Sequence, residues 1–209
     1  MKFYTLLAAI ILVSIFSVKC KDSKETPPPP QPLVKKETVL NDKVEIPEKG
    51  PIVNIIDTLE VKRIVLCVKD SSATSAGLSE KLNNIYNKKI PEAITAAKLK
   101  VTGPPMAWYK SQKAPFFFEV GVPIEKAPIK MPKGFFIKKT GGDSAIVAHF
   151  YGPNVMSSVG YDAVVEMLKE RKRKKTAPAY EIYIDNPFEV KKGKIDAYKQ
   201  QTDIVLPYK

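Results

Sequence analysis

The feature that most constrains the fold of this chain is an internal repeat. The segment GPPMAWY at residues 103–109 aligns without gaps on APAYEIY at residues 177–183, and FEVGVPI at 118–124 aligns on TDIVLPY at 202–208. Identities are few, but a proline, a tyrosine and an acidic residue recur at matching places. A repeat of this kind predicts a domain built from two similar structural units.

Each copy of the repeat predicts the same order of elements. Short segments rich in Ile, Val and aromatic residues predict strands, and apolar residues at helical spacing predict one helix in each copy. The predicted strands are 52–56, 62–68, 106–110 and 116–124 in the first copy, and 135–139, 145–151, 180–184 and 203–207 in the second; the helices are 75–98 and 154–174. We therefore expect an α+β fold of two pseudo-symmetric β-β-α-β-β units, with antiparallel sheets and a cleft between the halves.

The second predicted helix has a definite start and a definite buried side. Asn154 is expected to be its N-cap, since asparagine is favoured at that position. The apolar residues expected to form its buried side are Val155, Val159, Ala163, Val164, Met167 and Leu168.

An apolar segment at the start of the chain predicts export. Residues 3–18 are mostly apolar and follow Lys2, which is the layout of a signal peptide. This run is shorter than the roughly 17–25 residues of a spanning helix. We expect residues 1–19 to be a lipoprotein-like signal, with Cys20 as the lipidation site. The residue before such a cysteine is normally small and here is Lys19, so an uncleaved anchor or an ordinary N-terminus are the alternatives.

The segment between this signal and the repeat predicts a flexible tether. Residues 20–50 are rich in Lys and Pro, include four consecutive prolines at 27–30, and contain few aromatic residues. Such a composition buries too little apolar surface to fold by itself. We therefore expect one globular domain at 51–209, held outside the cytoplasm at a bacterial membrane in the cell envelope.

Charge and metal-binding residues limit the partners of the chain. The formal net charge of +12 favours contact with anionic molecules or surfaces. The basic run at 169–175 is typical of a solvated helix end, with an anionic membrane as a second interpretation. The chain has one histidine, two cysteines and no CxxC motif, so we expect no metal site and no cofactor. His149 as a haem ligand is a minor alternative, and Cys67 is interpreted as a buried apolar residue.

The strand at 180–184 places Glu181 and Tyr183 on one side and Tyr180 and Ile182 on the other. We expect the apolar side, together with Trp108, to contact the helices. The repeat then predicts an opposite face that gathers Tyr109, Phe117, Glu119, Tyr151, Glu181 and Tyr183. Aromatic rings and carboxylates together suit a cationic ligand. The alternative interpretation is an ordinary sheet face in contact with solvent.

Five segments also carry a resemblance to a known family. They are GPPMAWY, FFFEVGVPI, AHFYGP, the predicted helix after it, and AYEIYIDNP, and their order and spacing resemble those of the gyrase-inhibitor-like (GyrI-like) small-molecule-binding domain. This domain is also the effector-binding domain of bacterial multidrug-responsive transcription activators. The resemblance covers about residues 51–209. It implies a cleft between two pseudo-symmetric halves, in which Glu181 helps to receive cationic or amphipathic molecules.

The expected function is therefore that of a membrane-tethered, exported protein that binds small, partly apolar and cationic molecules. The activators carry a separate helix-turn-helix domain that is not recognisable before residue 51 here, so we expect no nucleic acid partner. One alternative is a hydrolase of strained electrophilic small molecules with Glu181 as the general base. Another is a structural or partner-binding lipoprotein.

Replacing Cys20 tests the predicted anchor. Cys20→Ser is expected to release the protein from membranes or to block its processing, because the thiol is the predicted attachment point of the lipid. Fractionation and gel mobility measure both effects. A variant that fractionates and migrates like the wild type would rule out the lipoprotein interpretation.

Overall fold

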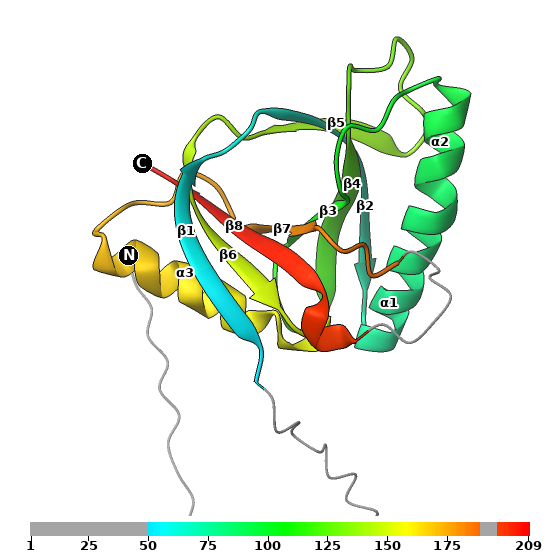
Figure 1. The fold of residues 1–209 in the computed structure, drawn as a ribbon. Coiled ribbons are helices and arrows are strands. Elements are labelled where there is room, and N and C mark those ends of the chain that lie inside the picture. Colours follow the sequence, from blue (N-terminus) through cyan, green and yellow to red (C-terminus); the bar gives the residue numbers. More distant parts are fainter. Residues whose placement is uncertain (1–49, 189–195) are drawn as a thin grey trace, which may run out of the picture. The chain divides into compact units, whose positions relative to one another are not determined.

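The computed structural model describes residues 50–188 and 196–209 (Figure 1). In this part of the chain, one sheet contains eight strands in the order β1-β6-β8-β7-β3-β4-β2-β5, and neighbouring strands are antiparallel throughout. The strands are β1 (Ile52–Leu59), β2 (Arg63–Ser72), β3 (Met106–Tyr109), β4 (Phe116–Ile124), β5 (Phe135–Thr140), β6 (Ser144–Tyr151), β7 (Tyr180–Tyr183) and β8 (Gln201–Tyr208). The predicted α+β class is confirmed.

The helices also lie close to their predicted positions. The first copy contains α1 (Ser75–Asn84) and α2 (Ile90–Ala96), which are joined by a π-helical turn at Ile85–Lys89. The second copy contains α3 (Ser158–Glu170), which follows a short 3-10 turn at Asn154–Met156. A further 3-10 turn at Ala197–Lys199 precedes β8.

The strand order is itself pseudo-symmetric. It reads the same from both ends when β1 to β4 are exchanged with β5 to β8. The pseudo-twofold axis therefore passes between β3 and β7, where Ala107 pairs with Glu181. These two residues also align with each other in the sequence repeat. A matching pair of backbone hydrogen bonds, Thr102 N to Pro123 O (2.9 Å) and Thr176 N to Pro207 O (3.0 Å), supports the same alignment.

The two halves exchange their first strands. Strand β1 of the first copy pairs with β6 of the second, and β5 of the second pairs with β2 of the first. The repeat did not predict this exchange, because strand sequences alone do not select their partners. As a result, the halves are joined both at the centre of the sheet and at its two ends.

One face of the sheet carries the helices. In the first half, Leu82, Ile85 and Ile90 pack on a cluster that includes Phe118 and Val120. In the second half, α3 packs on β6 and β8 through Val164 and Leu168, which contact Phe150 and Ile204 among others. Val155 and Val159 were predicted on the same buried side but are exposed. That prediction is wrong because α3 begins only at Ser158 and turns Gly160, Val164 and Leu168 toward the sheet.

The opposite face of the sheet holds the third buried cluster. Trp108, Tyr180, Ile182 and Val205 pack there with residues of β2 and β6, and the rings of Trp108 and Tyr180 are 5.1 Å apart. The sheet is strongly curved (Figure 1), so β6 and β2, which lie second from its two ends, both contribute to this cluster. The prediction that Trp108 and Ile182 contact the helices is therefore wrong. Both faces of β3 and β7 are buried, and the side with Glu181 is the one that meets the helices.

No helix in residues 50–188 or 196–209 is long and apolar enough to cross a bilayer. The predicted signal, Cys20 and nearly all of the predicted tether lie outside the described residues.

Trp108→Ala tests the cluster on the face away from the helices. Trp108 is 7% exposed, and removing a large buried aromatic side chain lowers the free energy of unfolding by about 3–5 kcal/mol. Chemical denaturation measures the change. The matched control is Phe117→Ala, because Phe117 is 47% exposed and should change stability far less. Equal stability of wild type and Trp108→Ala would contradict this packing.

Candidate functional site

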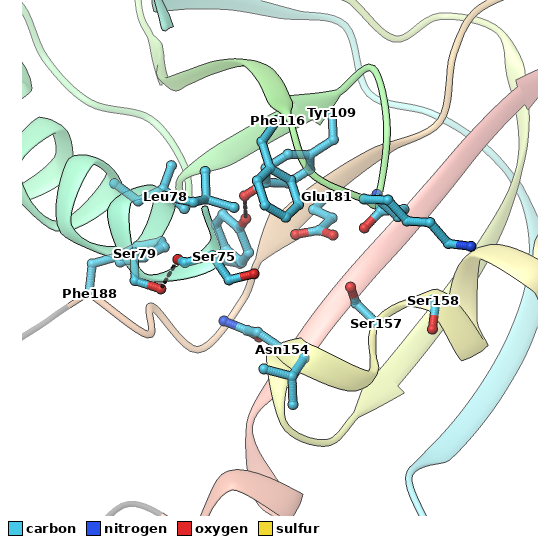
Figure 2. Close-up of a pocket in the computed structure, with 15 residues that line it drawn as sticks. Ser75, Leu78, Ser79, Tyr109, Phe116, Asn154, Ser157, Ser158, Glu181 and Phe188 are labelled. Carbon is cyan, nitrogen blue, oxygen red and sulfur yellow. Dashed lines mark hydrogen bonds between the residues drawn. The ribbon is translucent and has the colours of Figure 1, made fainter. Parts of the chain in front are cut away.

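A pocket of about 370 Å³ lies between the two halves on the helix side of the sheet. The first half contributes residues of α1, β3, the loop after β3, and β4, among them Ser75, Leu78, Tyr109 and Phe116. The second half contributes Asn154, Ser157, Ser158, Glu181, Tyr183 and Phe188. Figure 2 shows the Glu181 carboxylate in the space between Phe116 and Ser157.

Glu181 is the one carboxylate among the residues that line this pocket. Its side chain reaches the pocket from the centre of the sheet, because β7 is short and Glu181 sits at the pseudo-twofold axis. The residue is only 4% exposed. None of the ion pairs within the described residues includes it. One basic residue, Lys113, also lines the pocket, but it is exposed on the loop between β3 and β4.

Burial governs the protonation of Glu181. Removal of the carboxyl group from water disfavours its charged form and raises its pKa from 4.5 to about 6. The nearby hydroxyl groups of Tyr183, Tyr161 and Ser157 favour the charged form and limit the rise in the pKa. Glu181 is therefore mostly ionised at neutral pH while lying in a nearly dry environment.

Two tyrosines meet across the pseudo-twofold axis. Tyr109 and Tyr183 are aligned by the sequence repeat, and their hydroxyl oxygens lie 2.9 Å apart in a hydrogen bond. Burial and the nearby Glu181 charge raise the pKa of both tyrosines. Both are therefore neutral at physiological pH and line the pocket as uncharged aromatic side chains.

Further aromatic rings complete one side of the pocket. The Phe188 ring stacks on Tyr86 at 4.7 Å and meets Tyr183 edge-on at 5.4 Å. The Asn87 side-chain amide donates a hydrogen bond to the Phe188 carbonyl oxygen (2.8 Å). Phe188 thus belongs to a fixed aromatic wall, although its own segment is neither helix nor strand.

The structure brings three of the six predicted site residues together. Glu181, Tyr183 and Tyr109 all line the pocket. Their role in binding stays a prediction. The other three predicted residues do not line it.

Phe117, Glu119 and Tyr151 lie on the face of the sheet away from the helices. Glu119 pairs with Lys138 at 2.5 Å, and the Tyr151 hydroxyl donates to Gln201 at 3.0 Å. The prediction that these residues share a face with Glu181 is wrong. For Phe117 and Glu119 the reason is the register between β3 and β4, which pairs Tyr109 with Phe118 and Trp108 with Glu119, so the even-numbered residues of β4 face the helices. For Tyr151 the reason is the register through β8, where Ile204 pairs with both Glu181 and Ala148, so the even-numbered residues of β6 face the helices too.

The sequence reasoning also missed several lining residues. Phe116 could have been found, since it lies two residues before Phe118 and shares its side of β4. Ser157 and Ser158 lie at the start of α3, which was predicted to begin earlier. Phe188 carries no periodic signal because it lies in a loop.

Other reactive side chains lie outside the pocket. His149 Nδ1 is 2.7 Å from Asp203 Oδ1 on the far face of the sheet. Burial raises the pKa of the Cys67 thiol to about 12, so this cysteine is protonated and unreactive. Within the described residues, no three metal-ligating side chains of His, Cys, Asp or Glu come together.

No protein-family model matches the chain, and no curated protein matches its sequence. Among solved structures, the C-terminal domain of EcmrR aligns with a TM-score of 0.61 at 13% identity, covering 77% of this chain and 99% of that domain. EcmrR in its DNA complex aligns with a TM-score of 0.60 at 13% identity, over 76% of this chain and 57% of that longer one. A hydrolase from Listeria innocua aligns with a TM-score of 0.53 at 10% identity, over 75% of this chain and 92% of the hydrolase chain. These likenesses establish the fold, which is consistent with the expected GyrI-like domain.

The pH dependence of stability tests the burial of Glu181. The folded-state pKa of about 6 is above the ordinary 4.5. Between these two values the native state binds more protons than the unfolded state, so the wild type loses stability as pH rises through this range. The free energy of unfolding of Glu181→Gln, relative to that of the wild type, should therefore rise by about 2 kcal/mol between pH 4 and pH 7. Denaturation at several pH values measures this difference. The exposed Glu166→Gln is the control, and a flat difference for Glu181→Gln would contradict the raised pKa.

Proposed function

We propose that this domain binds small, partly apolar monocations in the pocket, with Glu181 as the countercharge. The observation that carries the proposal is a buried carboxylate with no ion-pair partner among the described residues. An ionised carboxylate out of water is unfavourable unless it is paired. A bound cation would supply the missing charge and offset that cost.

The surroundings of Glu181 favour an organic cation over a metal ion. The rings of Tyr109, Phe116, Tyr183 and Phe188 line the same pocket, and the faces of aromatic rings attract cations. The pocket volume of about 370 Å³ lies within the range of small-molecule sites. A single carboxylate matches a single positive charge. The similarity in fold to the C-terminal domain of EcmrR agrees with the GyrI-like fold for which a small-molecule pocket is expected.

A hydrolase is the second candidate function. The pKa of Glu181 near 6 is suitable for a general base close to neutral pH, and the Tyr109–Tyr183 pair could donate a hydrogen bond to a leaving group. In this case Glu181 would take a proton from water as the water oxygen attacks the electrophilic carbon. The strained bond from that carbon to a heteroatom would break, and the heteroatom would receive a proton from the Tyr109–Tyr183 pair. Both candidates use one site and differ in turnover.

We also propose that the protein is exported and anchored in the bacterial cell envelope. The apolar run at residues 3–18, Cys20 and the proline-rich segment behind it support this proposal.

Binding of benzyltriethylammonium tests the proposed function. Glu181→Gln keeps the shape of the side chain and removes its charge. It should therefore weaken binding of this cation by about 1–3 kcal/mol, which is roughly a 5- to 150-fold loss of affinity. The uncharged carbon isostere of the same cation should bind both forms equally. Calorimetric titration and thermal shift measure the affinities.

The matched control is Glu119→Gln, which makes the same chemical change on the opposite face of the sheet. It should leave cation affinity unchanged. Equal affinities of wild type and Glu181→Gln for every cation would remove Glu181 from the site. Consumption of a strained electrophile by the wild type, abolished in Glu181→Gln, would instead support the hydrolase.

A further inference from the structure

The loop between β4 and β5 presents apolar side chains to solvent. In this loop, residues 125–134 with the sequence EKAPIKMPKG, Ile129 is fully exposed (109%) and Met131 is 39% exposed. Figure 1 shows the loop projecting beyond the sheet beside the end of α2. A single exposed apolar side chain is ordinary on a protein surface, so the case for an interaction surface depends on the charges that lie beside Ile129.

The same surface is strongly basic. Two lysines from the segment after α2 join three from the loop, because the Glu125 amide donates to the Lys100 carbonyl oxygen at 3.0 Å. All five are exposed, and none takes part in the ion pairs found within the described residues. They are Lys98, Lys100, Lys126, Lys130 and Lys133. One acid, Glu125, lies among them.

The loop is constrained in a way that keeps its tip extended. Pro128 and Pro132 restrict the backbone, and the Phe135 amide closes a turn onto the Pro132 carbonyl oxygen at 3.1 Å. Gly134 takes a φ of 81°, which favours glycine. Ala96 and Ala97 line a hollow together with loop residues 128–133. Ile129 is therefore displayed outward instead of folding back onto the domain.

We propose that this basic, apolar loop docks on an anionic lipid bilayer. Ile129 and Met131 enter the boundary between headgroups and acyl chains, and the five lysines contact lipid phosphates. Nucleic acid would use the lysines but would give Ile129 no apolar surroundings. A second copy of the chain would need about 800 Å² from each partner, which two apolar side chains do not provide.

The other basic run of the domain is a weaker candidate for this role. In residues 169–175, Arg171 pairs with Asp57, and the Arg173 guanidinium lies over the Tyr208 ring at 5.7 Å. This run has no exposed apolar residue within it. Its cations are thus partly engaged with the domain itself.

Docking through the loop would leave the pocket accessible from water. The loop lies at the end of α2, whereas the pocket is lined by Ser75 and Ser79 at the start of α1. The helical segment between these points has about 22 residues, which corresponds to roughly 30 Å. A domain held by the loop would therefore keep the mouth of its pocket away from the lipid.

A fluorescent label at the tip of the loop tests the proposal on the full chain. Ile129→Cys is labelled with an environment-sensitive dye in a Cys20→Ser background, since Cys67 is buried. Vesicles of phosphatidylcholine with 30% phosphatidylglycerol should shift the emission of the label to the blue, and quenchers on the lipid tails should reduce it. Pure phosphatidylcholine should do neither. A label at Lys174→Cys should not respond, so insertion of residues 3–18 alone cannot produce the result.

Charge variants provide the matched comparison. Exchanging Lys126, Lys130 and Lys133 for Gln should weaken the response of the Ile129 label by about tenfold or more. Exchanging Lys172, Lys174 and Lys175 for Gln removes the same amount of charge but should weaken the response of the Ile129 label far less. Equal responses in neutral and anionic vesicles, equal effects of both triple variants, or a response to duplex DNA in place of vesicles would overturn the proposal.

Discussion

The burial of the Glu181 carboxylate on the pseudo-twofold axis is the constraint on which the site depends. Its symmetry counterpart is Ala107, which pairs with it directly across β3 and β7. A second acid at that position would place two like charges together and would raise their pKa values further. With alanine there, a symmetric framework holds a single charge. The site is thus asymmetric in charge although its walls come from both copies of the repeat.

The exchange of first strands explains how such a site stays in place. Strands β1 and β5 each pair with the opposite half. The helices of both halves therefore pack on one continuous sheet. Tyr109 and Tyr183 add a hydrogen bond across the axis at 2.9 Å. Groups held by packing and hydrogen bonds lose little freedom on binding. We infer that the pocket is largely formed before a ligand arrives.

The repeat and strand alternation were sufficient to predict the elements, the two-copy architecture and a common side of the sheet for Tyr109, Glu181 and Tyr183. They were not sufficient to predict which face of the sheet meets the helices. One side of β7 carries the apolar residues Tyr180 and Ile182. The other side carries Tyr183, which is also buried, as is Ala107 on the neighbouring strand β3. Apolar character therefore did not distinguish the two sides of the sheet. Strand curvature buries both faces, and curvature arises from contacts between distant strands. The register between strands also depends on long-range contacts, so Phe117, Glu119 and Tyr151 were assigned to the wrong face. Phe188 gave no periodic signal because it lies in a loop.

The central claim is that a buried, partly protonated Glu181 receives the cation, and proton release tests it most directly. A cation next to the carboxyl group lowers its pKa, so binding at pH 6 must expel protons from the fraction of molecules in which Glu181 is protonated. Calorimetry of benzyltriethylammonium in buffers of different ionisation enthalpy should show a release of about half a proton per cation at pH 6 and almost none at pH 8. Tight binding at pH 6 without proton release would contradict this account.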